Sequence, residues 1–147
     1  MRGSQRPSLG VTLIALVSGL VGTIIGAAIL LTPVEFHAAA GIVVGESASL
    51  RNEMRASGGA LLASGLFVVV GAFRGDLTFA AVLLAAMTYL AFGLSRAFSI
   101  VVDGVPDEML VIVAALEIAW GLVCASAVSG RLRKPVVQAG EGLPVSA

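Results

Sequence analysis

The chain has 147 residues, of which 58% are hydrophobic and 12% are charged, whereas an average soluble domain is roughly 45–50% apolar and about 25% charged. This composition argues strongly against a soluble fold, and the nine basic and nine acidic residues leave no net charge to attract nucleic acid. The class that remains is a small integral membrane protein of one domain, with the lipid bilayer as its solvent and partner.

The first uncharged stretch covers residues 9–31. About 20 residues at a rise of 1.5 Å cross a hydrocarbon core of ~30 Å, so this stretch predicts a transmembrane helix, which ends before Thr32-Pro33 because proline resists helix continuation. A cleaved secretory signal is the weaker alternative. The apolar run is longer than a signal core, and the small residues Ala38–Ala40 lie well beyond its end.

Three further spans follow a link over residues 33–46, whose apolar side chains are expected along the membrane surface. Ser47 is a plausible helix cap for the second span, and Gly75-Asp76 forms a turn so tight that the second and third spans must be antiparallel neighbours. The stop signal at 103–106 separates the third span from the fourth. The predicted spans are 9–31, 47–73, 77–102 and 109–130.

The sequence therefore predicts an all-α, four-helix transmembrane bundle over residues 1–134, followed by a disordered tail at 135–147. Basic residues near the span ends are more numerous on the side of the two termini. This bias predicts both termini in the cytoplasm of a multi-pass protein in the bacterial inner (plasma) membrane.

Redox and metal chemistry have little support in the sequence. Cys124 is the only cysteine and His37 the only histidine, so an internal disulfide or a clustered thiol site cannot form, and we expect no metal or other cofactor. The acidic turn with Asp103, Asp107 and Glu108 leaves a cation site open, but favourable electrostatics at a helix start explain it better.

Small residues form stripes at helical spacing on the first two spans. Ser18, Gly22 and Gly26 recur every four residues in the first, and Gly58 and Gly65 lie in the second. Such stripes let helix backbones approach closely in a membrane. We expect them to serve packing within one chain, with a homo-oligomer as the alternative.

Charged residues inside the predicted spans are the most informative feature. Arg55 and Glu117 lie ~12 Å from one end of the bundle and Arg96 ~9 Å, so three segments place charge at one depth. Such groups usually face the bundle interior and pair, because each is costly in hydrocarbon. We therefore predict a buried polar cluster of Asn52, Arg55, Arg96 and Glu117, in which Glu117 pairs with Arg96, Arg55 or both; a merely structural ion pair is the alternative.

The order of these motifs resembles a known family. The motifs are, in chain order, Asn52-Glu53-Met54-Arg55 with Gly58-Gly59, then Arg96 and Ser99, then Asp103-Gly104-Val105-Pro106, then Glu117. With this series the chain is similar to a group of small bacterial four-helix membrane proteins classed as a domain of unknown function. The similarity covers roughly residues 9–133. The resemblance implies the four-span topology and these polar positions, but no activity. A looser likeness to DoxX-like proteins is architectural only.

Two arginines against one glutamate in the predicted cluster favour a small anionic ligand or a lipid head group, bound without catalysis. No nucleophile–base pair, metal set or phosphate-binding loop points to an enzyme. The alternatives are an oligomeric small transporter or proton-coupled permease subunit, with Glu117 as the titrating group, and a structural accessory subunit of a membrane complex.

Overall fold

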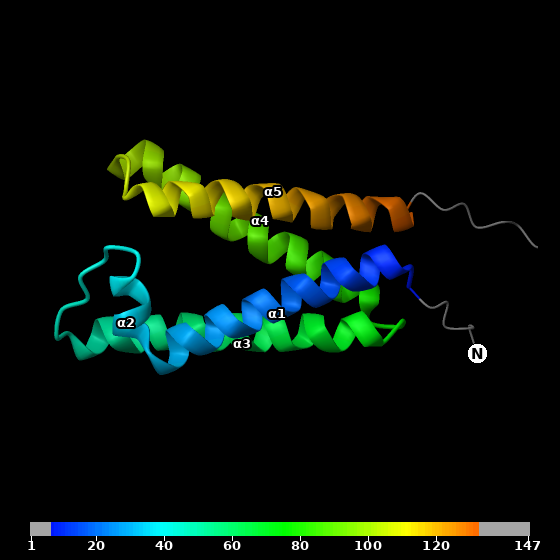
Figure 1. Ribbon diagram of the computed structural model, residues 1–147, viewed down its shortest axis with the longest axis horizontal. Helices are drawn as coiled ribbons and strands as arrows, with labels where there is room; N and C mark the ends of the chain where they lie inside the picture. Colours follow the sequence, from blue (N-terminus) through cyan, green and yellow to red (C-terminus); the bar gives the residue numbers. More distant parts are fainter. Residues whose placement is uncertain (1–6, 133–147) are drawn as a thin grey trace, which may run out of the picture.

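The computed structural model describes residues 7–132, and all regular secondary structure in that part is helical (Figure 1). Four helices are long and apolar enough to cross a membrane, as predicted, and a short fifth helix follows the first. The predicted tail at 135–147 lies outside the described residues. The helices are α1 (Leu9–Leu31), α2 (Pro33–Ala38), α3 (Ala48–Phe73), α4 (Thr78–Asp103) and α5 (Glu108–Leu132), with the four long ones within two residues of the predicted spans.

Local chemistry fixes the helix ends. The Ser47 hydroxyl accepts a hydrogen bond from Leu50 N at 3.2 Å, which caps α3. At the far end of α4, Gly104 has a φ of +101°, a conformation that glycine adopts without steric cost. Asp107 Oδ1 then accepts from Met109 N at 3.0 Å at the start of α5. These caps explain why the sequence signals located the boundaries well.

The long helices form two pairs. α1 packs along α3, α4 packs along α5, and neighbours in the chain run antiparallel (Figure 1). The start of α1 and the end of α5 lie at the same end of the bundle, which we call the terminal end. The other end, with α2 and the α4–α5 turn, is the loop end. Among the described residues, α3 and α5 do not pack against each other.

Glycine stripes hold the α1–α3 pair together. A Cβ added to Gly19 would lie 2.7 Å from Val69 N, and one added to Gly58 would lie 2.7 Å from Leu30 N, so both positions need glycine. Gly22 faces Gly65 at ordinary contact distance. The stripes predicted from sequence therefore face each other within one chain, and close backbone contact is what stabilises this pair in lipid.

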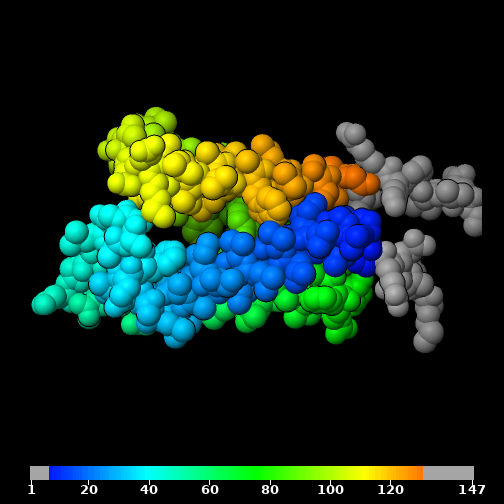
Figure 2. Space-filling model, in the orientation of Figure 1, coloured from blue at the N-terminus to red at the C-terminus, as the bar shows by residue number. Residues whose placement is uncertain are grey.

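The two pairs converge at the terminal end. Buried residues of all four long helices meet there, and Ala15, Ala72 and Cys124 are at most 1% exposed. Toward the loop end the pairs separate, and Figure 2 shows the surface hollowed between α1 and α5, with α4 visible behind. This divergence gives the molecule its main cavity.

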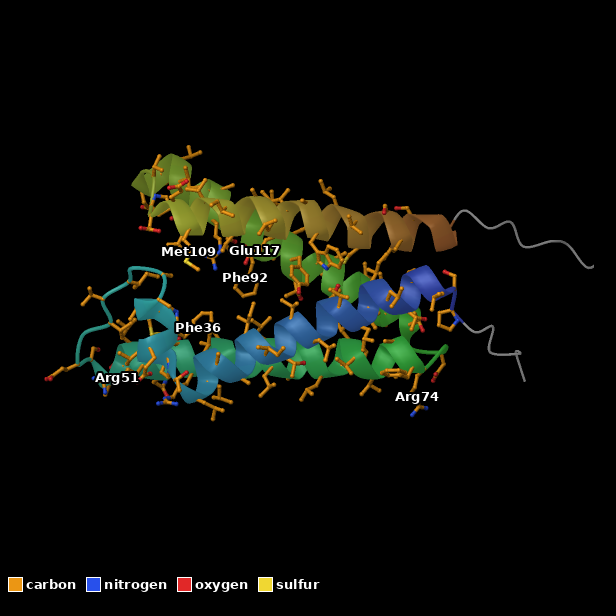
Figure 3. All side chains as sticks on the ribbon, in the orientation of Figure 1. Phe36, Arg51, Arg74, Phe92, Met109 and Glu117 are labelled. Atoms are coloured by element: carbon orange, nitrogen blue, oxygen red, sulfur yellow. The ribbon has the colours of Figure 1, made fainter. Side chains whose placement is uncertain are left out.

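The link between α1 and α3 differs from the expectation of a purely surface segment. Pro33 begins α2, where its missing N–H costs nothing and its fixed φ suits a helix start. Phe36 of α2 points toward the space between the helix pairs (Figure 3) and lines the cavity. Val43, further along the link, is 93% exposed.

Candidate functional site

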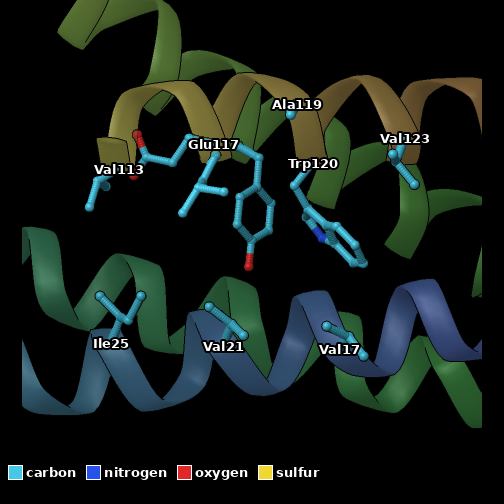
Figure 4. A pocket seen from close by; sticks show the side chains of 10 residues that line it. Val17, Val21, Ile25, Val113, Glu117, Ala119, Trp120 and Val123 are labelled. Atoms are coloured by element: carbon cyan, nitrogen blue, oxygen red, sulfur yellow. The ribbon is translucent and has the colours of Figure 1, made fainter. Parts of the chain in front are cut away.

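A cleft lies between the two helix pairs of the described chain. It consists of two hollows of about 450 and 330 Å³. The first runs between α1 and α5, as Figure 4 shows, and the second extends toward the loop end beneath α2. Four residues line both hollows and so mark their junction: Ile25, Tyr89, Val113 and Glu117.

The walls of the cleft are mainly aliphatic and aromatic. In the first hollow, Val17 and Val21 of α1 face Val113 and Val123 of α5 (Figure 4). Leu116, which also lines this hollow, is 63% exposed. The opening of the first hollow therefore borders the surface that faces lipid tails in a membrane.

A hydrogen-bonded junction centred on Ser18 closes the back of the first hollow. The indole Nε1 of Trp120 donates to Ser18 Oγ at 2.8 Å, and Ser18 Oγ donates to the carbonyl oxygen of Ile14 at 2.7 Å. The Tyr89 hydroxyl donates to the Ser18 carbonyl oxygen at 3.1 Å, and Cys124 Sγ lies 3.5 Å from Ser18 Oγ. Ser18 thereby ties α1 to both α4 and α5.

This junction was not predicted from the sequence. Ser18 fits a small-residue stripe equally well, and nothing in the sequence places it opposite Trp120. One signal was available: Trp120 is the only tryptophan, it lies mid-span, and it follows Glu117 by one helical turn. A buried indole N–H usually finds a hydrogen-bond acceptor.

The charged group on the cleft wall is an ion pair. Arg96 Nε donates to Glu117 Oε2 at 3.0 Å, and the two side chains are 36% and 18% exposed. Arg96 lies seven residues before the end of α4 and Glu117 nine residues after the start of α5, which places them roughly 10 and 14 Å inside the loop end. The structure thus brings together two of the four predicted site residues.

Arg55 and Asn52 lie elsewhere. Arg55 Nη1 donates to the carbonyl oxygen of Leu30 and, at 3.4 Å, to that of Leu31, so this guanidinium binds the last carbonyls of α1. Asn52 is exposed on α3, which does not pack against α5 in the described chain. The interior cluster therefore holds one arginine and one glutamate, and the arginine surplus expected from the sequence is not present there.

The acidic turn does not form a cation site in the described residues. Asp103 Oδ2 accepts from the Ser99 hydroxyl at 2.8 Å, and Asp107 caps α5. Among residues 7–132, no group of three or more His, Cys, Asp or Glu side chains is arranged to hold a metal ion. Local hydrogen bonds therefore account for Asp103 and Asp107.

Comparisons with known proteins agree with the fold. The model of one protein family, described as a domain of unknown function (DUF4345), matches residues 11–128, a range that includes α2, α3 and α4 and most of α1 and α5. No curated protein and no solved structure matches the chain, and the likeness to DoxX-like proteins gains no support. Because the family model covers most of its length, the chain belongs to the DUF4345 family, whose function is unknown.

Proposed function

We propose that this protein binds a lipid-like molecule in the cleft, without catalysing a reaction. The apolar chain of the ligand lies between α1 and α5, and its head group lies at the Arg96–Glu117 pair. The observation that carries the proposal is an ion pair on the wall of an otherwise apolar cavity. Small-molecule sites typically combine apolar walls with a few polar groups that orient the ligand, in volumes of roughly 300–1,000 Å³.

Arg96 and Glu117 retain hydrogen-bonding capacity for such a head group. A guanidinium has five N–H donors, and one of them is used in the bond to Glu117. Both residues line the second hollow, and neither has a buried polar atom without a partner. The remaining Arg96 donors and Glu117 Oε1 are therefore accessible and are not bonded to protein in the described chain.

The opening of the cleft favours a ligand that arrives from the bilayer. Leu116 is exposed at the edge of the first hollow, so a hydrocarbon chain can enter sideways without crossing water. A water-soluble metabolite would instead have to pass the loop end, where Phe36 and Met109 line the second hollow. A molecule with one long apolar chain and a compact polar end matches both hollows.

Lipid retention tests this proposal. The protein is purified in a mild detergent and its co-purifying lipids are identified by mass spectrometry. Val113→Trp fills the junction of the two hollows, whereas Ile112→Trp places the same bulk on an outward position of α5 that is 52% exposed. We expect Val113→Trp to lose a specific lipid that the wild type and Ile112→Trp retain.

A second pair of variants tests the polar end of the site. Arg96→Ala removes the guanidinium on the cleft wall, whereas Arg55→Ala removes one bound to α1 carbonyls. We expect Arg96→Ala alone to reduce retention. Equal retention in wild type, Val113→Trp and Arg96→Ala would overturn the proposal.

We further propose that the protein resides in the inner (plasma) membrane with both termini in the cytoplasm. The excess of basic residues on the side of the termini supports this orientation. Transport by an oligomer, with Glu117 as the titrating group, is the competing role. If proteoliposomes that contain the protein show substrate flux, and Glu117→Gln abolishes this flux, transport is favoured over lipid binding.

A further inference from the structure

The cleft carries no net charge. Among its lining residues, only Arg96 and Glu117 carry a charge at neutral pH, and they pair with each other. Two other charged groups toward the loop end are engaged elsewhere: Arg55 binds the end of α1, and Asp107 caps α5. A ligand head group therefore meets one positive and one negative side chain in an apolar enclosure.

The charge of the ligand then decides whether the occupied site stays neutral. A carboxylate or phosphate at Arg96 would make one guanidinium serve two acids and leave a net negative charge in the cavity. An ammonium at Glu117 would leave a net positive charge. Both are costly because an uncompensated charge in a low-dielectric environment loses its hydration without a matching partner.

From this balance we infer that the ligand is an uncharged amphiphile whose head group both donates and accepts hydrogen bonds, as a hydroxyl does. The oxygen accepts from the remaining N–H groups of Arg96, and the hydroxyl proton is donated to Glu117 Oε1. This inference rests on the proposed function, since it specifies the head group of the ligand proposed for the same cleft. It replaces the anionic ligand that the sequence favoured.

Trp120 provides a direct readout of occupancy. It is the only tryptophan in the chain, it lines the first hollow, and it follows Glu117 by one helical turn. Bromine quenches indole fluorescence over short distances. The probes are hexadecanol, hexadecanoate and hexadecylamine, each brominated at mid-chain. They are titrated into the purified wild-type protein in detergent. The pH is alkaline, so that the acid is ionised while the amine stays protonated.

We expect saturable quenching by the brominated alcohol, with an affinity about tenfold or more above those of the acid and the amine. Unbrominated hexadecanol should reverse the quenching by competition. A hexadecanoate affinity equal to or above that of hexadecanol overturns the uncharged head group. If no probe gives competable quenching, the proposed cleft binding itself fails, so the two failures are distinguishable.

Charge variants give a second, independent test. Glu117→Gln leaves the Arg96 charge uncompensated, so the preference should change in favour of hexadecanoate. Arg96→Gln leaves Glu117 uncompensated and should favour hexadecylamine. Arg55→Gln, outside the cleft, should keep the wild-type order. If folded Glu117→Gln protein keeps the wild-type preference for hexadecanol, the inference is contradicted. If this variant does not fold, the order of the three affinities in the wild type decides the inference alone.

Discussion

Ser18 Oγ in α1 accepts a hydrogen bond from Trp120 Nε1 in α5 at 2.8 Å, and this bond joins the two helix pairs near the middle of the bundle. Apart from this bond, α1 and α5 pack against each other over only a small area. The bond therefore adds to the Tyr89–Ser18 hydrogen bond and the shared core in holding the two pairs together. It also holds the indole against the first hollow, where a ligand chain would pass.

Ser18→Ala and Trp120→Phe test this bond in a double-mutant cycle. Each single change should lower the melting temperature in detergent, and the coupling between them should be about 0.6 kcal/mol and at most ~1.7 kcal/mol, the range for interhelical hydrogen bonds in membranes. Ser126→Ala is the control, because within residues 7–132 Ser126 bonds only to the Val123 carbonyl oxygen of its own helix. Strictly additive losses would show that the bond contributes nothing.

Two adjacent glycines should respond in opposite directions to alanine. A Cβ on Gly58 would lie 2.7 Å from Leu30 N in α1, whereas one on Gly59 would meet nothing within 4 Å. Gly58→Ala should therefore destabilise the protein by about 1–3 kcal/mol through overpacking. Gly59→Ala should stabilise it by about 0.5–1 kcal/mol, because glycine weakens a helix. Thermal unfolding in one detergent measures both, and equal effects would contradict the α1–α3 packing.

The Arg96–Glu117 pair should be sensitive to removal of one partner. Arg96→Gln leaves Glu117, 18% exposed, without its cation. Breaking a fully buried pair costs ~3–5 kcal/mol, so we expect about 1–3 kcal/mol at this partly exposed site. The exchange Arg96→Glu with Glu117→Arg should restore most of the loss. Asp76→Asn, which breaks a surface pair of 3.7 Å, should change stability by less than about 1 kcal/mol.

Arg55 should contribute to stability but not to ligand binding. Its guanidinium satisfies carbonyl oxygens at the end of α1, so Arg55→Ala should cost about 1 kcal/mol and loosen the junction of α1 and α2. Hydrogen exchange of peptides that cover residues 28–38 should increase. A loss of cleft occupancy with unchanged exchange would instead place Arg55 in the site that the sequence predicted for it.

The orientation in the membrane can be tested by cysteine labelling. In a Cys124→Ser background, Val43→Cys introduces a thiol at a position 93% exposed near the loop end, and Asp76→Cys introduces one in the α3–α4 turn at the opposite end. An impermeant maleimide added to intact cells should label Val43→Cys only. Labelling of Asp76→Cys alone would reverse the predicted topology.

The positions of the helices could be predicted because they depend on local properties of the chain. Apolar runs of membrane length with few charges defined the spans, and cap residues such as Ser47 and Asp107 lie beside the helices that they begin. The glycine stripes predicted close helix packing, since only small residues permit it. None of these signals requires knowledge of a distant contact.

The partners of the polar side chains depend on how the helix pairs diverge. The sequence placed Arg55 and Arg96 at a similar depth, and depth alone cannot tell which of them faces Glu117. In the structure α3 lies away from α5, so Arg55 meets the end of α1 while Arg96, on the helix packed against α5, pairs with Glu117. The sequence by itself determined four membrane-length helices and their charged positions, because hydropathy and capping act locally. Only the tertiary structure decided the cleft, which arises from the divergence of the helix pairs, and the choice of Arg96 over Arg55 as the partner of Glu117, because α4 and not α3 packs against α5.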